Sequence, residues 1–344
     1  MKIICWNCQG LGPPWTVCTL NELIRLYDPG LVFLSETKCR NRKCEYLKEK
    51  YNMYGINVDA RGKSGGLILL WRKDVNLVIQ SFSSSHIDTS IVSEIGEAGW
   101  RFTGIYGQPD AARRGETWQL LKHLSRLSSR SWVCAGDFNE IMCQEEKSGK
   151  IMRPWRHIEA FRECMTDCNL TDLGFQGHLF TWCNMREPPK TVNARLDRPV
   201  ATPDWRLRFP HACVTHLPRR GLDHCPLLLQ LEPGPNVDRK GPKKFFRFEA
   251  MWSRASDCED VIRKFWSGGD DSCAGERVWQ RLQAVRGGLN DWDKTCFGHV
   301  GRRIQELEKK LESKSGEPAS GANWAEYRRD KKELEELLNR EETM

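Results

Sequence analysis

The first 235 residues alternate apolar runs of strand length with segments whose apolar residues recur at helical spacing. The strand-like runs are KIICW, LVFL, GGLILLW, WVCAG and PLLLQL, and the helix-like segments are TLNELIRLY, TWQLLKHLSRL and PWRHIEAFRECM. Two further runs, HIDTSIVSEI and WRFTGIY, are joined through GEAG and predict a β-hairpin. Because strands and helices are interleaved throughout, the pattern predicts an α/β or α+β fold with a substantial sheet.

A segment rich in proline, glycine and charge, EPGPNVDRKGPKK, follows the last apolar run at residues 232–244. It predicts a boundary between a domain over 1–235 and a linker with a helical extension over 236–344. Within the extension, one predicted helix carries apolar residues on a single face: Ile304, Leu307 and Leu311. A second helical pattern follows the loop KSGEPASGAN, which predicts an antiparallel helical hairpin.

The composition argues against a membrane-spanning or disulfide-rich protein. No apolar run approaches the roughly 20 residues that a membrane-spanning helix requires, and the start MKIICWNCQG is too short an apolar stretch for a signal peptide. The fifteen cysteines are odd in number and many lie in apolar patterns, which favours reduced thiols in an intracellular protein. Cys5 and Cys8 form a CxxC without a second pair, so we do not expect a zinc site there.

The formal net charge is +7, and nearly all of the surplus lies in residues 1–235. A modest basic surplus suits an anionic partner such as nucleic acid, although many ordinary proteins share it. The segment DRKGPKKFFR resembles a weak nuclear-targeting signal, so we expect a nuclear location. The segment NVDARGKS, residues 57–64, nearly matches a phosphate-binding P-loop, but Asn57 replaces the first glycine and no strand is predicted to run into it. We therefore exclude nucleoside triphosphate binding at this segment.

The most informative feature is the polar residue that follows each strand-like run. These strand-end residues are Asn7, Glu36, Tyr106, Asp137 with Asn139 two positions later, and the pair Asp223–His224 before PLLLQL. In a layered sheet the strand ends collect at one edge, where polar groups converge into one pocket. A single polar residue after a strand is typical of an ordinary turn. Polar residues at so many strand ends favour a functional site.

The chemistry of this set fits metal-assisted hydrolysis of a phosphate ester. Glu36 is a carboxylate for a divalent cation, and Mg²⁺ binds one or two protein carboxylates while leaving room for phosphate oxygens. An aspartate deprotonates water, while histidine and tyrosine hydrogen-bond the charge that develops on phosphate. No serine or cysteine lies in a recognisable nucleophile motif, which argues against covalent catalysis.

These residues lie in motifs that resemble the endonuclease/exonuclease/phosphatase superfamily. The motifs occur in the family's order: WNCQG (6–10), SET (35–37), IYG (105–107), GDFNE (136–140), HLFTWCN (178–184), RLDR (195–198) and LDHCPLLL (222–229). The resemblance covers residues 1–235 and is strongest to the apurinic-type endonucleases of plant LINE, or non-LTR, retrotransposons. Residues 245–312 resemble the linker that precedes the reverse transcriptase there. The polymerase motif YADD or FADD is missing, so we expect a truncated or domesticated retroelement product.

The resemblance implies a four-layered αββα sandwich, in which two mixed β-sheets are flanked by helices, with a C-terminal helical extension. It implies an Mg²⁺-dependent endonuclease, with Mn²⁺ as a substitute, that nicks one strand of DNA and leaves a 3′-hydroxyl. The implied metal ligands are Glu36, Asn7 and Asp223. The implied catalytic residues are Asp137 as the base, Asn139 beside it, His224 with Asp197 orienting its ring, and Tyr106 as a donor to phosphate, with Asp223 near the metal.

Two positions depart from the family pattern, and both lie beside the implied metal site. Leu222 stands where the family usually has a serine before the aspartate–histidine pair, so a neighbouring polar group loses a partner. Gln9 stands where some repair-type relatives carry an acid. The loops 107–116 and 184–195 are expected to set target-site preference. Their arginines Arg113, Arg114 and Arg186 are candidates for DNA backbone contacts, with solvated surface as the alternative.

Other interpretations stay open on the sequence alone. Asp197 between Arg195 and Arg198 is also consistent with a surface ion pair. The whole protein is alternatively a catalytically weakened relic that binds nucleic acid or a protein partner, or, less favoured, a phosphatase of small phosphoesters. The oligomeric state and the target sequence are not indicated by any pattern.

Overall fold

The computed structural model describes most of the first 232 residues and parts of the C-terminal region. The described residues are 1–62, 64–92, 99–187, 189–220, 222–232, 257–266, 281–289, 291–292, 303–304, 306–307, 309–311 and 321–342. The chain divides into two compact units, one of residues 1–236 with 316–324 and the other of residues 237–315 with 325–344. None of the described helices is both long and apolar enough to cross a membrane.

The first unit contains two six-stranded mixed sheets. The first sheet has the order β13-β14-β1-β2-β4-β3. Its strands are β1 (Lys2–Asn7), β2 (Leu31–Ser35), β3 (Met53–Val58), β4 (Leu67–Arg72), β13 (Cys213–His216) and β14 (Leu227–Gln230). The apolar segment at the chain's start lies in the middle, parallel to β2 and antiparallel to β14. Both faces of this sheet are packed against apolar clusters, which explains why its central strands are nearly continuous apolar runs in the sequence.

The second sheet has the order β5-β6-β7-β8-β12-β9. Its strands are β5 (Leu77–Ser83), β6 (His86–Ile91), β7 (Trp100–Tyr106), β8 (Trp132–Asp137), β9 (Thr171–Asp172) and β12 (Asp197–Ala201). The predicted hairpin is present, because β6 and β7 are antiparallel neighbours. Its connection GEAG falls largely outside the described residues. A small two-stranded sheet pairs β10 (Trp182–Cys183) with β11 (Asn193–Ala194).

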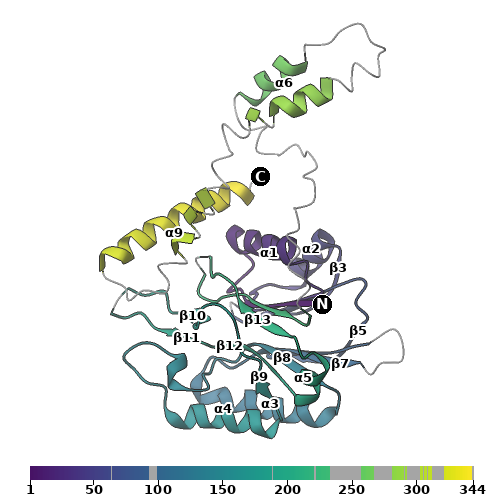
Figure 1. The fold of residues 1–344 in the computed structure, drawn as a ribbon, viewed down its shortest axis with the longest axis vertical. Coiled ribbons are helices and arrows are strands. Elements are labelled where there is room, and N and C mark those ends of the chain that lie inside the picture. Colours follow the sequence, from purple (N-terminus) through teal and green to yellow (C-terminus); the bar gives the residue numbers. More distant parts are fainter. Residues whose placement is uncertain are drawn as a thin grey trace. The chain divides into compact units, whose positions relative to one another are not determined.

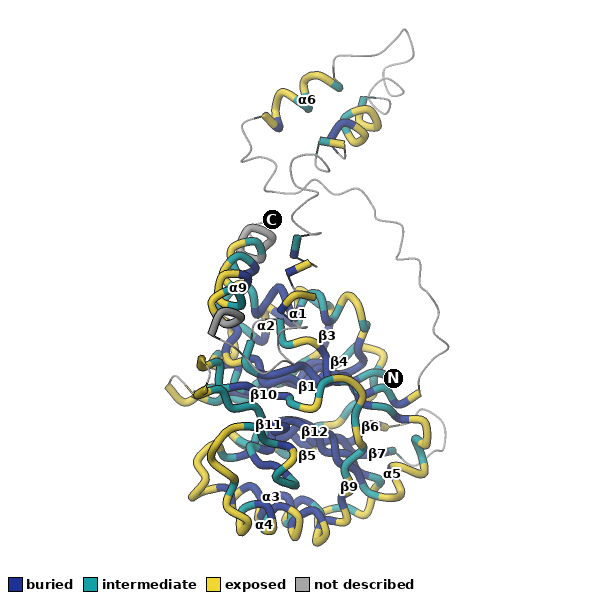
Figure 2. The backbone as a smooth tube through the Cα atoms, turned by 60° about the vertical axis from the view of Figure 1, so that its left-hand side comes forward, coloured by how far each residue is buried: buried dark blue, intermediate teal, exposed yellow. Residues whose placement is uncertain are grey.

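Alternate side chains of each central strand enter different layers of the core, as the two-residue period of a strand requires. Ile3 and Cys5 of β1 lie in the apolar cluster between the two sheets, and Ile4 and Trp6 lie in the cluster on the sheet's outer face. The other central strands of both sheets divide their side chains in the same way, for example with Val133 between the sheets and Cys134 outside. The strands are therefore buried on both faces (Figure 2).

Helices cover the outer faces of both sheets. The first sheet is covered by α1 (Pro14–Tyr27) and α2 (Asn41–Tyr51), and the second by α3 (Arg114–Leu127) and α4 (Trp155–Asp167) (Figure 1). Short helical turns at η1 (Ala111–Arg113) and η2 (Gln144–Glu146) and the helix α5 (Pro203–Arg208) complete this unit. The predicted four-layered αββα sandwich of two mixed sheets is thus confirmed, with helical segments following it toward the C-terminus.

The described part of the C-terminal unit is helical. It includes α6 (Cys258–Trp266), a helical stretch at 281–289, the fragments of residues 303–311, and α9 (Gly321–Glu342) from residue 325 onward. The predicted apolar face of the first hairpin helix is buried at Ile304, Leu307 and Leu311. Arg303 forms an ion pair with Glu333 of α9, so these two segments are in contact. The predicted boundary segment at 232–244 lies outside the described residues, apart from Glu232.

One expectation about residues 57–64 is corrected by the fold. A strand does run into this segment, because β3 continues to Val58. The strand was missed because its side chains are mostly half-buried rather than continuously apolar. The loop leads to the antiparallel strand β4 and not to a helix, so it lacks the helix N-terminus that a P-loop provides for phosphate. Nucleoside triphosphate binding at this segment is therefore still excluded, but because no helix follows the loop rather than because no strand precedes it.

Candidate active site

The candidate site begins where β1 and β8 end, because both strands place their last side chain between the two sheets. Asn7 continues the inward series of Ile3 and Cys5, and Asp137 continues that of Val133 and Ala135. Asn7 Nδ2 accordingly donates to Asp137 Oδ2 at 2.9 Å across the gap between the sheets. Both residues are at most 2% exposed. The two-residue period of the strands therefore creates the centre of the site.

Glu36 joins this centre from the end of β2. Its Oε1 accepts hydrogen bonds from Asn7 Nδ2 at 2.9 Å and from the Tyr106 hydroxyl at 3.0 Å. The Glu36 backbone has φ +50°, a left-handed conformation that side-chain-bearing residues adopt at a cost. The next residues hold it in place, since the Thr37 and Lys38 amides donate to the carbonyls of Gly66 and Gly65. The turn aims the carboxylate at the strand ends.

His224 and Asp197 form the other side of the centre. Asp197 is the register partner of Asp137 in the β8–β12 pair, so the two carboxylates face the same side of the sheet. His224 Nδ1 donates to Asp197 Oδ2 at 2.8 Å, and its Nε2 lies 3.9 Å from Asp137 Oδ2. Like charges directly opposite one another are unfavourable. A protonated imidazole beside both carboxylates offsets this repulsion.

Backbone pairing fixes the segment that carries His224. The amide of Cys183 donates to the Asp223 carbonyl at 2.9 Å, and the amide of Cys225 donates to the Thr181 carbonyl at 2.7 Å. The Trp6 indole nitrogen adds a 3.4 Å contact to the His224 carbonyl. The aspartate–histidine pair is thus anchored on both sides before β14 begins.

Thr181 is a positioning residue that the strand-end pattern did not indicate. Its hydroxyl accepts hydrogen bonds from the amides of Leu196 and Asp197, each at 3.0 Å, and the residue is fully buried. It therefore ties the start of β12 to the segment that pairs with residues 223–225. The signal was present in the motif HLFTWCN, where a threonine interrupts an aromatic run.

Asn139 reaches the site by a route other than the predicted one. The extended path does not continue past Asp137, because β8 ends there and Asn139 has φ +56°. The Asn139 amide donates to Asp137 Oδ1 at 2.8 Å, forming a tight local turn. Its side-chain Nδ2 donates to the Gly107 carbonyl at 2.8 Å and lies 3.3 Å from Asp137 Oδ2. Asn139 therefore supports Asp137 directly.

Burial and charge shift the pKa values of the central groups in opposite ways. Burial and the neighbouring charge of Asp197 raise the pKa of Asp137 to about 7, although His224 and the bond from Asn7 oppose the shift. Burial alone would lower the pKa of His224, but the charge and hydrogen bond of Asp197, with the charge of Asp137, raise it to about 10. Near neutral pH the pair is therefore a titrating carboxylate beside an imidazolium.

Tyr106 and Asp223 are shifted toward their neutral forms. Burial, followed by the charges of Glu36 and Asp137, raises the pKa of Tyr106 well above its ordinary value. The phenol therefore stays protonated and able to donate. Burial and the charge of Glu36 raise the pKa of Asp223, with His224 opposing. An added positive charge near Asp223 would favour its carboxylate form.

The ligand set around Glu36 fits a hard cation such as Mg²⁺. Asp223 Oδ1 is buried and has no hydrogen-bond partner among the described residues, while Gln9 Nε2 donates to Oδ2. Glu36 Oε2 has only the distant ammonium of Lys38, at 3.9 Å, as an ion-pair partner in the described chain. The carboxylate oxygens of Glu36 and Asp223 are ligands that Mg²⁺ prefers. The amide oxygen of Asn7 is also a suitable ligand type, but here it accepts a 3.3 Å hydrogen bond from the Gln9 amide, and the Asn7 nitrogen faces Glu36.

A second group of potential ligands lies in the same centre. Asp137, Asp197 and His224 offer ligand atoms within 4.8 Å of one another. The histidine of this group already donates to Asp197, and a nitrogen ligand is less suited to Mg²⁺ than to transition metals. The oxygen set at Glu36 is therefore the better match to a hard cation.

The three arginines proposed as DNA contacts lie in different environments. Arg113 and Arg186 are exposed, and Arg113 forms a two-pronged ion pair with Glu116. Arg114 departs from the expectation, because its side chain is buried and bonds to the fully buried Glu140 at 2.8 Å. The physical reason is that Glu140 needs cationic partners, which Arg114 and Arg153 supply. Arg114 is therefore unavailable to a ligand.

The alternative of a surface ion pair at Asp197 is also resolved. Asp197 is 2% exposed and bonds to His224. Arg195 and Arg198 turn instead to Glu146 and Asp172, in a buried network with N–O distances of 2.6–2.9 Å. The arginines of RLDR thus hold the strand that carries Asp197, rather than neutralising it.

Leu222 packs against the apolar cluster on the outer face of the first sheet. Its amide donates to the Arg219 carbonyl at 3.0 Å, which closes a turn before Asp223. The leucine therefore has a structural role in this chain. The unpartnered Asp223 Oδ1 next to it is consistent with a missing hydroxyl as well as with a bound cation.

Three solved structures with the same architecture are described as nucleases. The endonuclease domain of TRAS1, a telomere-specific non-LTR retrotransposon, has a TM-score of 0.51 at 14% identity, covering 67% of this chain and 97% of that one. The 3′-5′ exonuclease NExo from Neisseria meningitidis has a TM-score of 0.53 at 16% identity, and the match covers 68% of this chain and 100% of that one. An AP endonuclease from Archaeoglobus fulgidus has a TM-score of 0.52 at 18% identity, and the match covers 67% of this chain and 98% of that one. At these identities the similarity shows the fold alone.

A sequence comparison with curated proteins finds no match to this chain. The model of the Endonuclease/Exonuclease/phosphatase family matches residues 4–257. This range is most of the chain and contains all of the candidate site residues from Asn7 to His224. The chain therefore belongs to the endonuclease/exonuclease/phosphatase family.

Proposed function

We propose that this protein is an Mg²⁺-dependent DNA endonuclease of non-LTR retroelement origin that nicks one strand, leaves a 3′-hydroxyl and acts in the nucleus. The observation that carries the proposal is the hydrogen-bonded series Glu36–Asn7–Asp137 beside the His224–Asp197 pair. Its members are a carboxylate oxygen whose ion-pair partner in the described chain is 3.9 Å away, a base with a pKa near 7 and an imidazolium. Members of this family are nucleases or phosphatases, and these groups are suited to the hydrolysis of a phosphate ester.

Each side chain has a role in the proposed reaction. Asp137 accepts a proton from the attacking water, because its pKa of about 7 matches the working pH. The water oxygen attacks phosphorus, the bond from phosphorus to O3′ breaks, and O3′ gains a proton. His224, held charged by Asp197, donates to a phosphate oxygen. The neutral Tyr106 hydroxyl donates to another phosphate oxygen by exchanging its bond to Glu36. A Mg²⁺ ion held by Glu36, Asp223 and Asn7 would supply positive charge to the same oxygens.

The neighbouring structures support the choice of substrate class. The TRAS1 domain is a retrotransposon endonuclease, and a related 3′ phosphatase from Neisseria is described bound to a product DNA hairpin. The basic surplus of the chain is consistent with a polyanionic substrate. Mn²⁺ is expected to replace Mg²⁺, because both ions favour oxygen ligands.

Relaxation of supercoiled plasmid tests the proposal. The purified chain should convert the plasmid to the nicked circle in Mg²⁺, and the nick should be extended by a DNA polymerase, which requires a 3′-hydroxyl. Glu36→Ala and His224→Ala should abolish nicking, while the matched exposed controls Glu45→Ala and His211→Ala should not. Absence of nicking by folded protein across Mg²⁺ and Mn²⁺ titrations would overturn the endonuclease assignment.

The second candidate is a relic that binds nucleic acid without cutting it, and Leu222 is the observation that favours it. A serine hydroxyl that the family usually provides beside Asp223 is absent, and one Asp223 oxygen has no partner in the described chain. A relic would bind DNA in a salt-sensitive way that survives Glu36→Ala, without any nicking. Release of phosphate from soluble esters, measured in parallel, would instead identify a small-phosphoester phosphatase.

A further inference from the structure

We propose that a cavity beside Tyr106 is a subsite for a backbone phosphate of the substrate strand, on one side of the phosphodiester that is cleaved. This inference rests on the proposed function, since it assigns where the strand continues. The cavity has a volume of about 320 Å³, which lies within the range of about 300–1,000 Å³ found for ligand pockets. Its walls come from three loops that are far apart in the sequence.

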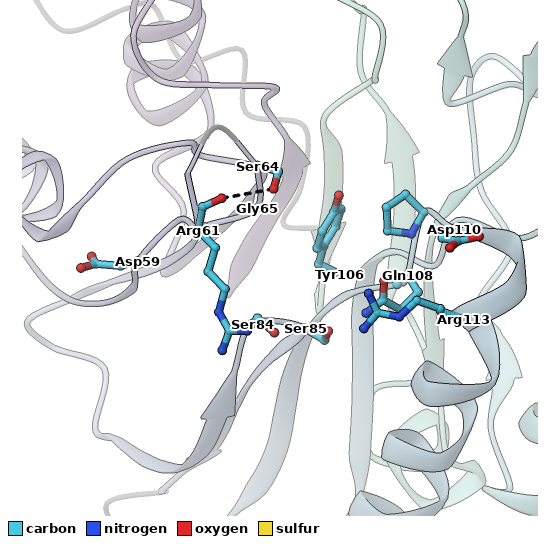
Figure 3. A pocket seen from close by; sticks show the side chains of 13 residues that line it. Asp59, Arg61, Ser64, Gly65, Ser84, Ser85, Tyr106, Gln108, Asp110 and Arg113 are labelled. Carbon is cyan, nitrogen blue, oxygen red and sulfur yellow. Dashed lines mark hydrogen bonds between the residues drawn. The ribbon is translucent and has the colours of Figure 1, made fainter.

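The three loops contribute different chemical groups. The loop after β3 supplies Arg61 and a glycine-rich stretch, the β5–β6 turn supplies Ser84 and Ser85, and the segment after β7 supplies Gln108 to Arg113. Figure 3 shows Arg61 and Arg113 extending toward the cavity from opposite walls, with Ser84 and Ser85 between them. Cations, hydroxyls and an amide are the donors that proteins use to bind phosphate oxygens.

The cavity wall carries two arginines and two aspartates, and the arginines are the groups that would bind an anion. Arg61 is exposed and its guanidinium forms no ion pair within the described chain. Of the two aspartates on the walls, Asp59 points away from the cavity in Figure 3 and Asp110 accepts the amide of Ala112 at the start of η1. Arg113 is shared with Glu116, but that pair is exposed and readily exchanged for a phosphate contact.

Tyr106 joins this cavity to the candidate active site. Its ring lies on the cavity wall, and its hydroxyl donates to Glu36 Oε1 at 3.0 Å. A strand whose reactive phosphate lies at Glu36 therefore has an adjacent path past Tyr106 into the cavity. Gly65, with φ +71° and open space around its Cα, leaves room for the strand there. The glycine-rich loop that fails as a P-loop thus has a role in binding phosphate from a polynucleotide.

Direct binding measurements test this subsite without relying on catalysis. A short fluorescent DNA duplex would be titrated with the protein of residues 1–344 in EDTA, at several salt concentrations. Arg61→Gln should raise the dissociation constant about tenfold at low salt and lower the salt dependence by about one counterion. Arg113→Gln should change the dissociation constant and the salt dependence by similar amounts. In the double variant the two reductions in affinity should add. Arg126→Gln, at the exposed far end of α3, is the matched control that should bind like the parent.

The outcomes separate this inference from the proposed function. Turnover of a small phosphodiester, bis(p-nitrophenyl) phosphate, should be unchanged in Arg61→Gln, because the cavity is not needed for a substrate without further phosphates. If the parent protein binds DNA but cuts nothing, weaker binding by the arginine variants still supports the subsite. If both variants bind DNA as the parent does, or if the parent cleaves small esters but binds no DNA, the subsite is overturned.

Discussion

His224 donates a 2.8 Å hydrogen bond from Nδ1 to Asp197 Oδ2, and both side chains are at most 4% exposed. This bond fixes the ring so that Nε2 faces Asp137 at 3.9 Å. It also requires two distant segments to meet, since β12 carries the aspartate and the turn before β14 carries the histidine. The orientation of the imidazole therefore depends on this bond, and its charge depends on Asp197 together with Asp137 and Asp223.

Asp197→Asn should lower the rate of plasmid nicking by about 100-fold or more, since loss of one positioned hydrogen-bond donor to the developing charge costs about 10²–10³ in rate. The amide preserves the shape of the side chain but removes the charge that keeps His224 protonated. Asp204→Asn, on the exposed face of α5, is the matched control. A nicking rate within threefold of the parent would show that Asp197 has only a structural role.

The nicking rate should depend on pH with two limbs. It should rise as pH passes about 7, where Asp137 loses its proton, and fall near 10, where His224 loses its charge. Single-turnover rates measured between these limits in saturating Mg²⁺ would show the plateau. A rate that is flat through neutral pH would exclude Asp137 as the group that accepts the proton from water.

The architecture was readable from the sequence wherever a strand is buried on both faces. β1, β2, β4, β8 and β14 are continuous apolar runs because each lies between a helical layer and the other sheet. The polar residue at each end then marks the edge at which the site forms. Strands with mixed surroundings were missed, as β3 and the short β9 illustrate, because half-buried residues show no clear period.

The sequence predicted the side chains that form the site, but not all of the residues that position them. Asn7 and Asp137 could be placed at one edge, but their direct contact depends on which face each strand turns inward. Thr181 supports Asp197 by accepting hydrogen bonds from the backbone amides of Leu196 and Asp197, and the strand-end pattern that selected the other residues does not include it. Arg114 was a candidate DNA contact because it lies in the loop 107–116. Its burial depends on Glu140, which approaches only in the folded chain.

Arg198→Met should destabilise the fold by about 3–5 kcal/mol, because it leaves buried carboxylates without a partner. Arg198 is fully buried and bonds to Glu146 and Asp172. Although burial opposes the shift, the arginines hold the pKa values of both carboxylates below their usual range. Urea unfolding would measure the loss, with the exposed Arg162→Met as control.

The same network predicts how stability changes in acid. A carboxylate whose folded pKa is depressed contributes stability above its unfolded pKa, and that contribution is lost as pH falls through the folded value. The stability of the parent should therefore decline below about pH 4, and that decline should be shallower in Arg198→Met. Parallel declines in the two proteins would show that Glu146 and Asp172 are not the groups that titrate.

Leu222→Ser should lower the free energy of unfolding by about 1–2 kcal/mol, because a half-buried leucine leaves the apolar cluster that it packs against. Nicking should stay within threefold of the parent, because the turn at Leu222 is held by its backbone bond to Arg219. Thermal melts and the plasmid assay measure the two effects. A tenfold gain in nicking would show that the missing hydroxyl limits this enzyme.

Mg²⁺ should stabilise the folded protein through Glu36 even when no DNA is present. At a concentration about 100 times the dissociation constant, binding to the native state alone adds about 2.7 kcal/mol to the free energy of unfolding. Glu36→Gln should remove this gain, because it removes the charge of the carboxylate whose Oε2 is nearly free. Glu45→Gln, an exposed glutamate paired with Lys48, should retain it. His224→Gln should retain it too, and loss of the gain in that variant alone would place the cation between Asp137 and Asp197 instead.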